Sequence, residues 1–428
     1  MTRARSLAVL AAVPALLLSL LGGISPAGAA TVRGASYFPV TPNRLLDTRV
    51  GTGAPAHPIG PGGSVDLTVI GVGGVPILVG ATGVPDGVRA VVLNVTATDA
   101  TAPDSFLTVY PAGTPRPLAS NLNVKAGTTA TNLVKVSVST TGEKIGKVTI
   151  YNNTGSVSVV VDVSGWYAVG TGGTYNQSPA RRVLDTRNGR GGTSGAVSAG
   201  QTIDLPLDLP GASVTGISAV VLNVTAIHAG GPESYLTVFP AGTDRPLASN
   251  LNFLDRAVVP NLVIVRLGAN GKVSIYNNLG LAHIVADVQG YYTGTDTPSF
   301  GSTYFPLAPA RDLDTRTGTG TGGTIAKLGA GQTLEFAVTG VNGVPTTEVT
   351  AVVLNVTAVD HSGADSYLTV YSGLNRPFAS NLNFVAGQTV ANLVVVPVVA
   401  GGKVLIYNNR GSVDVAADIQ GWFRIYSE

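Results

Sequence analysis

The chain has 428 residues, of which 26 are basic, 24 are acidic and none is cysteine. Charged residues make up 12% of it, half of the roughly 25% usual in globular proteins. The charge balance gives no electrostatic footprint for nucleic acid or anionic lipid, and the missing cysteines exclude disulfides, thiol catalysis and thiolate metal sites.

The first 29 residues have the pattern of a secretory signal peptide. Arg3 and Arg5 form a positive start, Leu7–Leu21 is an apolar core too short for a comfortable membrane span, and Ala27–Ala29 offers a small-residue cleavage site. We expect a secreted protein, extracellular or associated with the cell surface, with no membrane span in the mature chain. Cleavage removes two arginines and leaves 24 basic and 24 acidic residues.

The rest of the chain repeats the same short sequence blocks three times in the same order. The first three blocks are Leu-Asp-Thr-Arg from Leu46, Leu184 and Leu313, Ala-Val-Val-Leu-Asn-Val-Thr-Ala from Ala90, Ala219 and Ala351, and acid-Ser-aromatic-Leu-Thr-Val from Asp104, Glu233 and Asp365. The fourth is an octet, Arg-Pro-Leu/Phe-Ala-Ser-Asn-Leu-Asn, at Arg116–Asn123, Arg245–Asn252 and Arg376–Asn383. The last three are Asn-Leu-Val from Asn132, Asn261 and Asn392, Ile-Tyr-Asn-Asn from Ile150, Ile275 and Ile406, and Asp-Val/Ile-x-Gly from Asp162, Asp287 and Asp418.

Each block alternates apolar and polar residues with the period of a β-strand, and clusters of Gly, Pro, Asn and Asp separate the blocks. About eight short strands per repeat predict an all-β protein of three tandem antiparallel β-sandwich or jelly-roll modules. We place the modules at residues 36–168, 175–293 and 303–428, joined by Gly/Thr-rich segments at Val169–Thr174 and Gly294–Ser302. We expect each module to close independently; the alternative is one body with pseudo-threefold symmetry.

These ordered blocks resemble a tandem β-rich repeat module of secreted actinobacterial proteins, which is often accessory to exported hydrolases. The resemblance covers nearly the whole mature chain and implies an extracellular accessory or surface role with no attached reaction. The second repeat departs most, with Asn176-Gln177-Ser178 in place of the Phe-Pro found at Phe38 and Phe305. If each repeat has a functional site, we expect the second repeat to be the one that has lost it.

Recurring carboxylates are the main candidates for chemistry. They lie at Asp47, Asp104 and Asp162 and at the equivalent positions Asp185, Glu233, Asp287, Asp314, Asp365 and Asp418. A carboxylate pair could serve a glycoside hydrolase, and oxygen ligands could hold calcium. Because arginines recur equally often, we favour structural ion pairs. The predicted pairs are Asp47 with Arg49, Asp185 with Arg187 and Asp314 with Arg316.

Aromatic and amide side chains give a second candidate site. In an extended chain the two asparagines of each octet share one face, and the aromatic residue after Leu-Thr-Val faces away from the core. A ring beside amides suits a sugar, because the ring covers C–H groups and the amides bind hydroxyls. The candidate ligand-binding residues are Tyr110, Asn121, Asn123, Phe239, Asn250, Asn252, Tyr371, Asn381 and Asn383. The alternative is a second inner face, packed by the aromatic rings, with the asparagines bonding the backbone.

The sequence therefore favours a secreted, non-catalytic surface or adhesion protein that binds polysaccharide or cell-wall polymer through repeated modules. It predicts no cofactor, no resident metal, no nucleic-acid partner and no catalytic residue. A passive structural or spacer protein of the cell surface is the alternative, and a carboxylate-dependent glycoside hydrolase is the third hypothesis.

Overall fold

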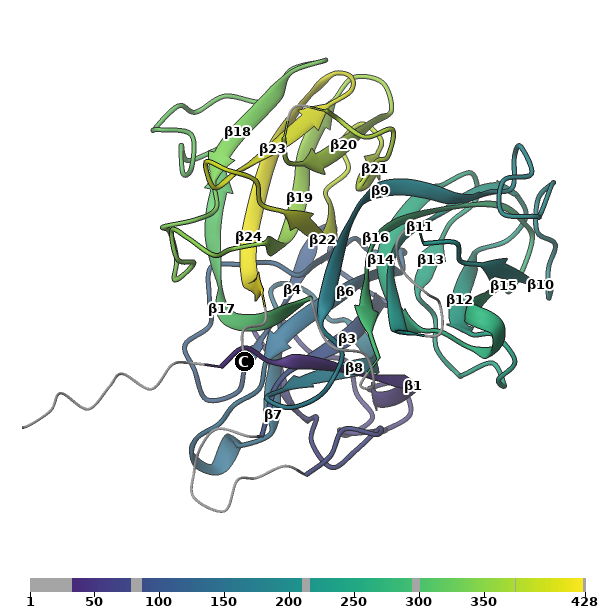
Figure 1. Cartoon of the computed structure of the whole chain (residues 1–428), viewed down its shortest axis with the longest axis horizontal. Coiled ribbons are helices and arrows are strands. Elements are labelled where there is room, and N and C mark those ends of the chain that lie inside the picture. The colour runs from purple at the N-terminus through teal and green to yellow at the C-terminus, as the bar shows by residue number, and fades with distance from the viewer. Residues whose placement is uncertain (1–32, 78–86, 210–215, 295–300, 374, 426–428) are drawn as a thin grey trace, which may run out of the picture. The chain divides into compact units, whose positions relative to one another are not determined.

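The structure, a computed structural model, describes residues 33–77, 87–209, 216–294, 301–373 and 375–425. The predicted signal peptide, Met1–Ala29, and most of the predicted joint at Gly294–Ser302 lie outside the described residues. Across the described residues the chain forms 24 strands and two short 3-10 turns, at Gly142–Lys144 and Ala269–Gly271 (Figure 1). Among these residues, no helical segment has the length and apolar character needed to cross a membrane.

The first eight strands form module 1. They are β1 (Ser36–Asp47), β2 (Ser64–Thr68), β3 (Val88–Thr98), β4 (Ser105–Pro111), β5 (Leu122–Val124), β6 (Ala130–Ser137), β7 (Lys147–Asn152) and β8 (Ser158–Ala168). They pair into two four-stranded antiparallel sheets, β1-β8-β3-β6 and β2-β7-β4-β5, which we call the inner and the outer sheet.

Modules 2 and 3 repeat this arrangement strand for strand. Module 2 contains β9 (Tyr175–Asp185), β10 (Thr202–Pro206), β11 (Ile217–Gly230), β12 (Ser234–Pro240), β13 (Leu251–Phe253), β14 (Val258–Arg266), β15 (Lys272–Asn277) and β16 (Leu281–Thr293). Module 3 contains β17 (Ser302–Asp314), β18 (Thr333–Ala337), β19 (Ala351–Ser362), β20 (Ser366–Tyr371), β21 (Leu382–Phe384), β22 (Val390–Pro397), β23 (Lys403–Asn408) and β24 (Ser412–Ile425).

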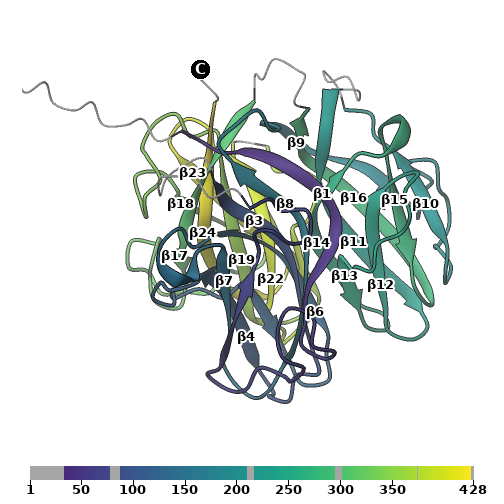
Figure 2. The ribbon, with the colours of Figure 1, turned by 90° about the horizontal axis from the view of Figure 1, so that it is seen from below.

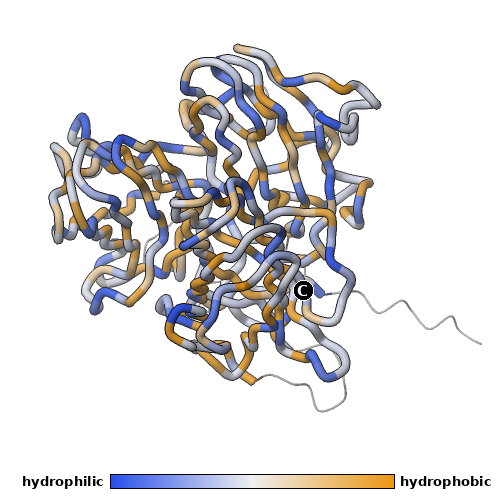
Figure 3. Tube along the Cα trace, turned by 180° about the vertical axis from the view of Figure 1, so that it is seen from behind, coloured by the Kyte–Doolittle hydropathy of each residue, from blue (hydrophilic) through white to orange (hydrophobic). Residues whose placement is uncertain are grey.

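Two facing four-stranded sheets connected in this order make a jelly roll, which confirms the predicted fold class. The period-two alternation explains the packing: Val91, Leu93 and Val95 of the inner sheet meet Leu107 and Val109 of the outer sheet in the module's own core. Figure 3 shows the same alternation as orange and blue segments along the strands. Each module has such a core, with nearly every member under 9% exposed.

A fourth core lies between the modules. It is built from the opposite faces of the three inner sheets, so Ala90 and Val92 are as fully buried as Val91 and Leu93. This shared core consists of Ala35, Tyr37, Ala90, Val92, Leu133, Tyr167, Tyr175, Ala219, Val221, Leu262, Ile264, Tyr292, Tyr304, Ala351, Val353, Leu393, Val395 and Phe423. Burial on both faces is the reason why these strands read as almost continuous apolar runs.

Aromatic rings and backbone bridges close the shared core with threefold regularity. Ring pairs join Tyr37 to Tyr292 with centroids 4.4 Å apart, Tyr175 to Phe423 at 4.6 Å and Tyr304 to Tyr167 at 4.6 Å. Strand bridges join Tyr37 to Gly173, Tyr175 to Ser302 and Tyr304 to Ala35. Through the second of these, β9 and β17 unite the inner sheets of modules 2 and 3 into one eight-stranded sheet (Figures 1 and 2).

The glycine that ends each Asp-x-x-Gly block makes room for these rings. A Cβ on Gly165 would lie 2.3 Å from the hydroxyl oxygen of Tyr37, and a Cβ on Gly421 would meet Tyr304 at 2.4 Å. The hydroxyl of Tyr37 then donates to the backbone oxygen of Ser164 at 3.0 Å. The recurring glycine therefore lets a tyrosine of the first strand cross the last strand of its own module.

The expectation of independently closed modules is wrong. Residues Gly34–Glu428 form one compact unit. The predicted joint Val169–Thr174 is partly ordered within it, because Gly173 exchanges two backbone hydrogen bonds of 2.8 Å with Tyr37. An exposed apolar sheet face has to be covered, and here the covering surface is the same face of the other two modules.

Candidate ligand-binding face

The first asparagine of each octet serves the fold. The chain bends at Asn121 before β5 begins, and its Oδ1 accepts the N–H of Val109 at 2.7 Å, with 1% of the residue exposed. Asn250 and Asn381 make the same bond, to Val238 and Val370, also at 2.7 Å. The prediction that Asn121, Asn250 and Asn381 contact a ligand is therefore wrong, because it assumed an extended chain across the octet.

The octets also hold neighbouring modules together. The side-chain amide of Asn223 in module 2 donates to the backbone oxygen of Ser380 in the octet of module 3, at 2.8 Å. Asn355 of module 3 donates to Ser120 of module 1 at 2.6 Å, and Asn94 of module 1 donates to Ser249 of module 2. The three contacts form a closed cycle, so each octet lies on the inner sheet of another module.

A second amide cycle fills the space between these contacts. The side-chain N–H of Asn132 donates to Oδ1 of Asn355 at 2.7 Å, and its Oδ1 accepts the N–H of Leu393 at 3.1 Å. In the same way, the side-chain amide of Asn261 donates to Asn94 and its Oδ1 accepts the N–H of Leu133. The side-chain amide of Asn392 donates to Asn223, and its Oδ1 accepts the N–H of Leu262. These buried asparagines satisfy one another and specify how the modules fit together.

The recurring carboxylates form ion pairs. The guanidinium of Arg49 contacts both carboxylate oxygens of Asp47, at 2.7 and 2.9 Å, and thereby lowers the pKa of Asp47. The pairs Asp185–Arg187 and Asp314–Arg316 have the same geometry, and the hydrogen bonds from Arg187 lower the pKa of Asp185 to about 2.

The carboxylate of Asp162 is held by an arginine that the sequence reasoning missed. The guanidinium of Arg44 contacts the carboxylate of Asp162 at 2.5 Å and that of Asp47 at 3.1 Å. In modules 2 and 3, Arg182 and Arg311 contact the equivalent pairs of carboxylates. Burial raises the pKa of Asp162, and the pKa of Asp418 rises for the same reason to about 6. The signal was present in the sequence, since an arginine precedes each Leu-Asp-Thr-Arg aspartate by three residues.

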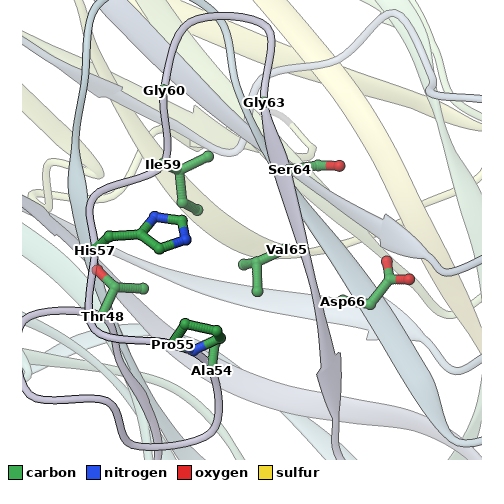
Figure 4. A pocket seen from close by; sticks show the side chains of 10 residues that line it. All are labelled: Thr48, Ala54, Pro55, His57, Ile59, Gly60, Gly63, Ser64, Val65 and Asp66. Atoms are coloured by element: carbon green, nitrogen blue, oxygen red, sulfur yellow. The ribbon is translucent and has the colours of Figure 1, made fainter.

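Two hollows lie at the edges of the outer sheets, and each is lined by a single acidic residue. The hollow of module 1 has a volume of about 340 Å³ and lies beside β2, where Val65 points into it together with Ile59 and His57 (Figure 4). Asp66 is its one acidic residue. The hollow of module 3, about 720 Å³, contains Glu335 as its one acidic residue. Neither hollow contains the pair of carboxylates that glycoside hydrolysis requires.

The outer face of the outer sheet collects aromatic and amide side chains. Across this face of module 1, Phe106 of β4 lies between Asn123 of β5 and Asn153, which follows β7. All three side chains are partly exposed. The same row is formed by Asn252, Tyr235 and Asn278 in module 2 and by Asn383, Tyr367 and Asn409 in module 3.

An arginine stacks on a tyrosine next to each row. The guanidinium carbon of Arg116 lies 4.2 Å from the ring centroid of Tyr151, whose ring is 6.4 Å from that of Phe106. Arg245 lies over Tyr276 at 4.0 Å and Arg376 over Tyr407 at 3.5 Å. All three arginines are exposed, and among the described residues none of them forms a salt bridge.

We call the row together with the stacked arginine and tyrosine the aromatic platform of a module. It contains the predicted residues Asn123, Asn252 and Asn383, although Asn252 also donates to Oγ1 of Thr131 in module 1. The predicted aromatics lie at its margin: Tyr110 is 9% exposed and Phe239 5%, and Tyr371 is partly exposed. Phe106, Tyr235 and Tyr367 were overlooked, although an aromatic residue follows acid-Ser in every repeat.

No other chemical centre is evident among the described residues: no group of three or more His, Asp or Glu side chains is placed to hold a metal ion. Two histidines are buried against aromatic rings, His228 beside Phe253 and His361 beside Phe384.

Comparisons with known proteins give only distant likenesses. No protein-family model and no curated protein matches the sequence. Among solved structures, the chain is similar to one titled as the atomic structure of Sulfolobus Turreted Icosahedral Virus, at 10% identity and a TM-score of 0.18, over 86% of this chain and 84% of the other.

Two further structures are similar to a comparable extent. One is a triple jelly roll of an archaeal virus, at 10% identity and a TM-score of 0.17 over 92% and 90% of the two chains. The other is the tandem CBM22 domain of Xyn10C from Paenibacillus barcinonensis, at 10% identity and a TM-score of 0.17, over 61% of this chain and 100% of the other. At TM-scores this low the matches establish no function.

Proposed function

We propose that this protein is a secreted, non-catalytic surface protein that binds polysaccharide of the cell envelope through the aromatic platforms of its three modules. The amino-terminal signal pattern supports export. The ion pairing of the buried carboxylates supports a binding role rather than a hydrolytic one, since Asp47 and Asp162 share the cation of Arg44.

The observation that carries the proposal is the row of one aromatic ring between two amides, present at the same place in every module. A partly exposed ring accepts the C–H face of a sugar, and amides on both sides supply donors and acceptors for its hydroxyls. The side chains of this row are partly exposed, whereas the octet asparagines Asn121, Asn250 and Asn381 are buried.

Three platforms within one compact unit suit a polymeric ligand. Each site can be weak, because engagement of one platform raises the effective concentration of the polymer at the others. The shared core fixes the spacing of the platforms, so a polymer long enough to reach two of them gains avidity without new contacts.

Co-sedimentation with insoluble cell-wall polysaccharide tests the proposal. We expect the mature protein to sediment with the polymer, and the triple variant Phe106→Ala/Tyr235→Ala/Tyr367→Ala to remain in the supernatant with an unchanged melting temperature. The matched control is Phe378→Ala, which removes a ring that is 100% exposed at the tip of an octet. A triple variant that stays folded and still sediments contradicts the proposal.

A passive structural role is the second candidate. It is favoured by the octets, whose most distinctive residues hold the modules together rather than facing solvent. Failure of the mature protein to sediment with any envelope polymer would support this role.

A further inference from the structure

The three aromatic platforms differ in charge although each has an aromatic ring between two amides. The platform of module 1 is bordered by the cations Arg116, Lys125, Lys144 and Lys147 and by the acids Asp66, Asp104 and Glu143. Module 2 has two cations at its platform, Arg245 and Lys272, and three acids, Asp204, Glu233 and Asp244. Module 3 has three cations, Arg376, Lys403 and Arg410, and two acids, Glu335 and Asp365.

Asp66 and Asp104 of the first platform already have cationic partners. Lys144 contacts Asp66 at 2.7 Å, and Lys125 contacts Asp104 at 3.6 Å. Arg116 and Lys147 remain, and neither forms a salt bridge within the described part of the chain. Lys147 lies on the same face of β7 as Tyr151 but also interacts with Asp66, so Arg116 is the cation of this platform that has no acidic partner.

From this charge distribution we infer that the platform of module 1 binds an acidic polysaccharide whose sugar rings carry carboxylates, and that module 2, where acids outnumber cations, binds it more weakly. The inference rests on the proposed polysaccharide binding and specifies its ligand. The guanidinium of Arg116 can bind a carboxylate through two parallel hydrogen bonds, because it is planar and has N–H groups that point in the same direction.

The geometry places this charge next to the sugar site. With Phe106 and Tyr151 6.4 Å apart, the guanidinium over Tyr151 lies beside a sugar ring seated on Phe106. A uronic acid carries its carboxylate directly on the ring, so one residue of the polymer can occupy both positions. Stacking on Tyr151 also holds the arginine in place before binding, which reduces the entropy lost on association.

Binding of the full mature chain to soluble polygalacturonate and to neutral dextran tests the inference. We expect tighter binding of polygalacturonate, an affinity that falls as NaCl rises from 50 to 300 mM, and a roughly tenfold or greater loss of polygalacturonate affinity in Arg116→Ala. Arg245→Ala, the matched variant in module 2, should change the affinity less than about threefold. Arg116→Lys should restore only part of it.

Other outcomes separate the inference from the proposed function. Equal losses in Arg116→Ala and Arg245→Ala, or equal affinity for the two polymers, would overturn the assignment to module 1 and to acidic sugars. If the triple variant Phe106→Ala/Tyr235→Ala/Tyr367→Ala then abolished binding of both polymers, polysaccharide binding would stand. Binding of neither these polymers nor insoluble cell-wall polysaccharide would overturn both.

Discussion

The side-chain amide of Asn355 in module 3 donates a hydrogen bond of 2.6 Å to the backbone oxygen of Ser120 in module 1, 235 residues earlier in the chain. The same side chain accepts the amide of Asn132, also from module 1, at 2.7 Å. One asparagine thus joins the last module to the first. Because Asn94 and Asn223 join the other two pairs of modules in the same way, the three modules form a closed ring.

Removal of this side chain should weaken the whole body. Asn355→Ala leaves the oxygen of Ser120 without this donor and takes one acceptor from Asn132, so we expect a loss of about 2–4 kcal/mol in the free energy of unfolding. Calorimetry should show a single transition that moves to lower temperature. The exposed Asn43→Ala is the control and should shift stability by less than about 0.5 kcal/mol. Three separate transitions would contradict a shared core.

Module 1 expressed alone should not be a stable monomer. Residues 34–168 would expose Tyr37, Val92, Leu133 and Tyr167, all of which are at most 1% exposed in the intact chain. We expect self-association or loss of fold, measured by sedimentation equilibrium and circular dichroism. A folded, monodisperse monomer would show that the inner sheet tolerates solvent on this face.

Lys135 should make stability depend on pH. Its ammonium is buried in the shared core 3.3 Å from the hydroxyl of Tyr292, and burial lowers its pKa well below the ordinary 10.5. Between the folded and unfolded pKa the unfolded chain binds more protons, so stability should rise with pH through this window, by up to about 1.4 kcal/mol per pH unit.

The matched variant Lys135→Met removes this titration. Modules 2 and 3 have Ile264 and Val395 at the same position, which shows that an apolar side chain fits. We expect Lys135→Met to be more stable than the parent protein at pH 7, with a flatter denaturation profile between pH 7 and 9. An unchanged pH slope would mean that the amine is not desolvated in solution.

Asp312 should destabilise module 3 when its carboxyl group ionises, above about pH 6. Burial raises its pKa to about 6, and its Oδ2 has no hydrogen-bond partner. Because the folded pKa exceeds the unfolded value near 4, stability should fall as pH rises from about 4 to 6. Asp312→Leu, which copies Leu45 of module 1, should add about 1–3 kcal/mol at pH 8 and less at pH 4. The reciprocal Leu45→Asp should introduce the same pH dependence into module 1.

Much of the architecture could be predicted from local pattern. The alternation of Val91, Leu93 and Val95 with polar or small neighbours predicts a strand, and the repeated order of blocks predicts the module boundaries. The jelly-roll class follows from strand number and turn spacing. The proximity of Asp47 to Arg49 could be predicted as well, because two residues separated by one position in a turn remain close whatever the rest of the chain does.

The roles of the octet and of the platform could not be predicted in the same way. Asn121 and Asn123 look equivalent in sequence, yet one is buried and the other is partly exposed, because the chain bends between Ser120 and β5. Likewise, Phe106 and Tyr110 lie on the same face of one strand, but Tyr110 is covered more completely. Side-chain alternation defines a face and does not show what else covers it.

The sequence by itself therefore determined the strands, the three repeats and the ion pairs within turns, all of which depend on residues close together in the chain. Only the tertiary structure decided that the inner sheets of three modules bury one another and that the octets join them. Covering an apolar sheet face requires a partner surface, and that partner lies more than 100 residues away, where no local pattern identifies it.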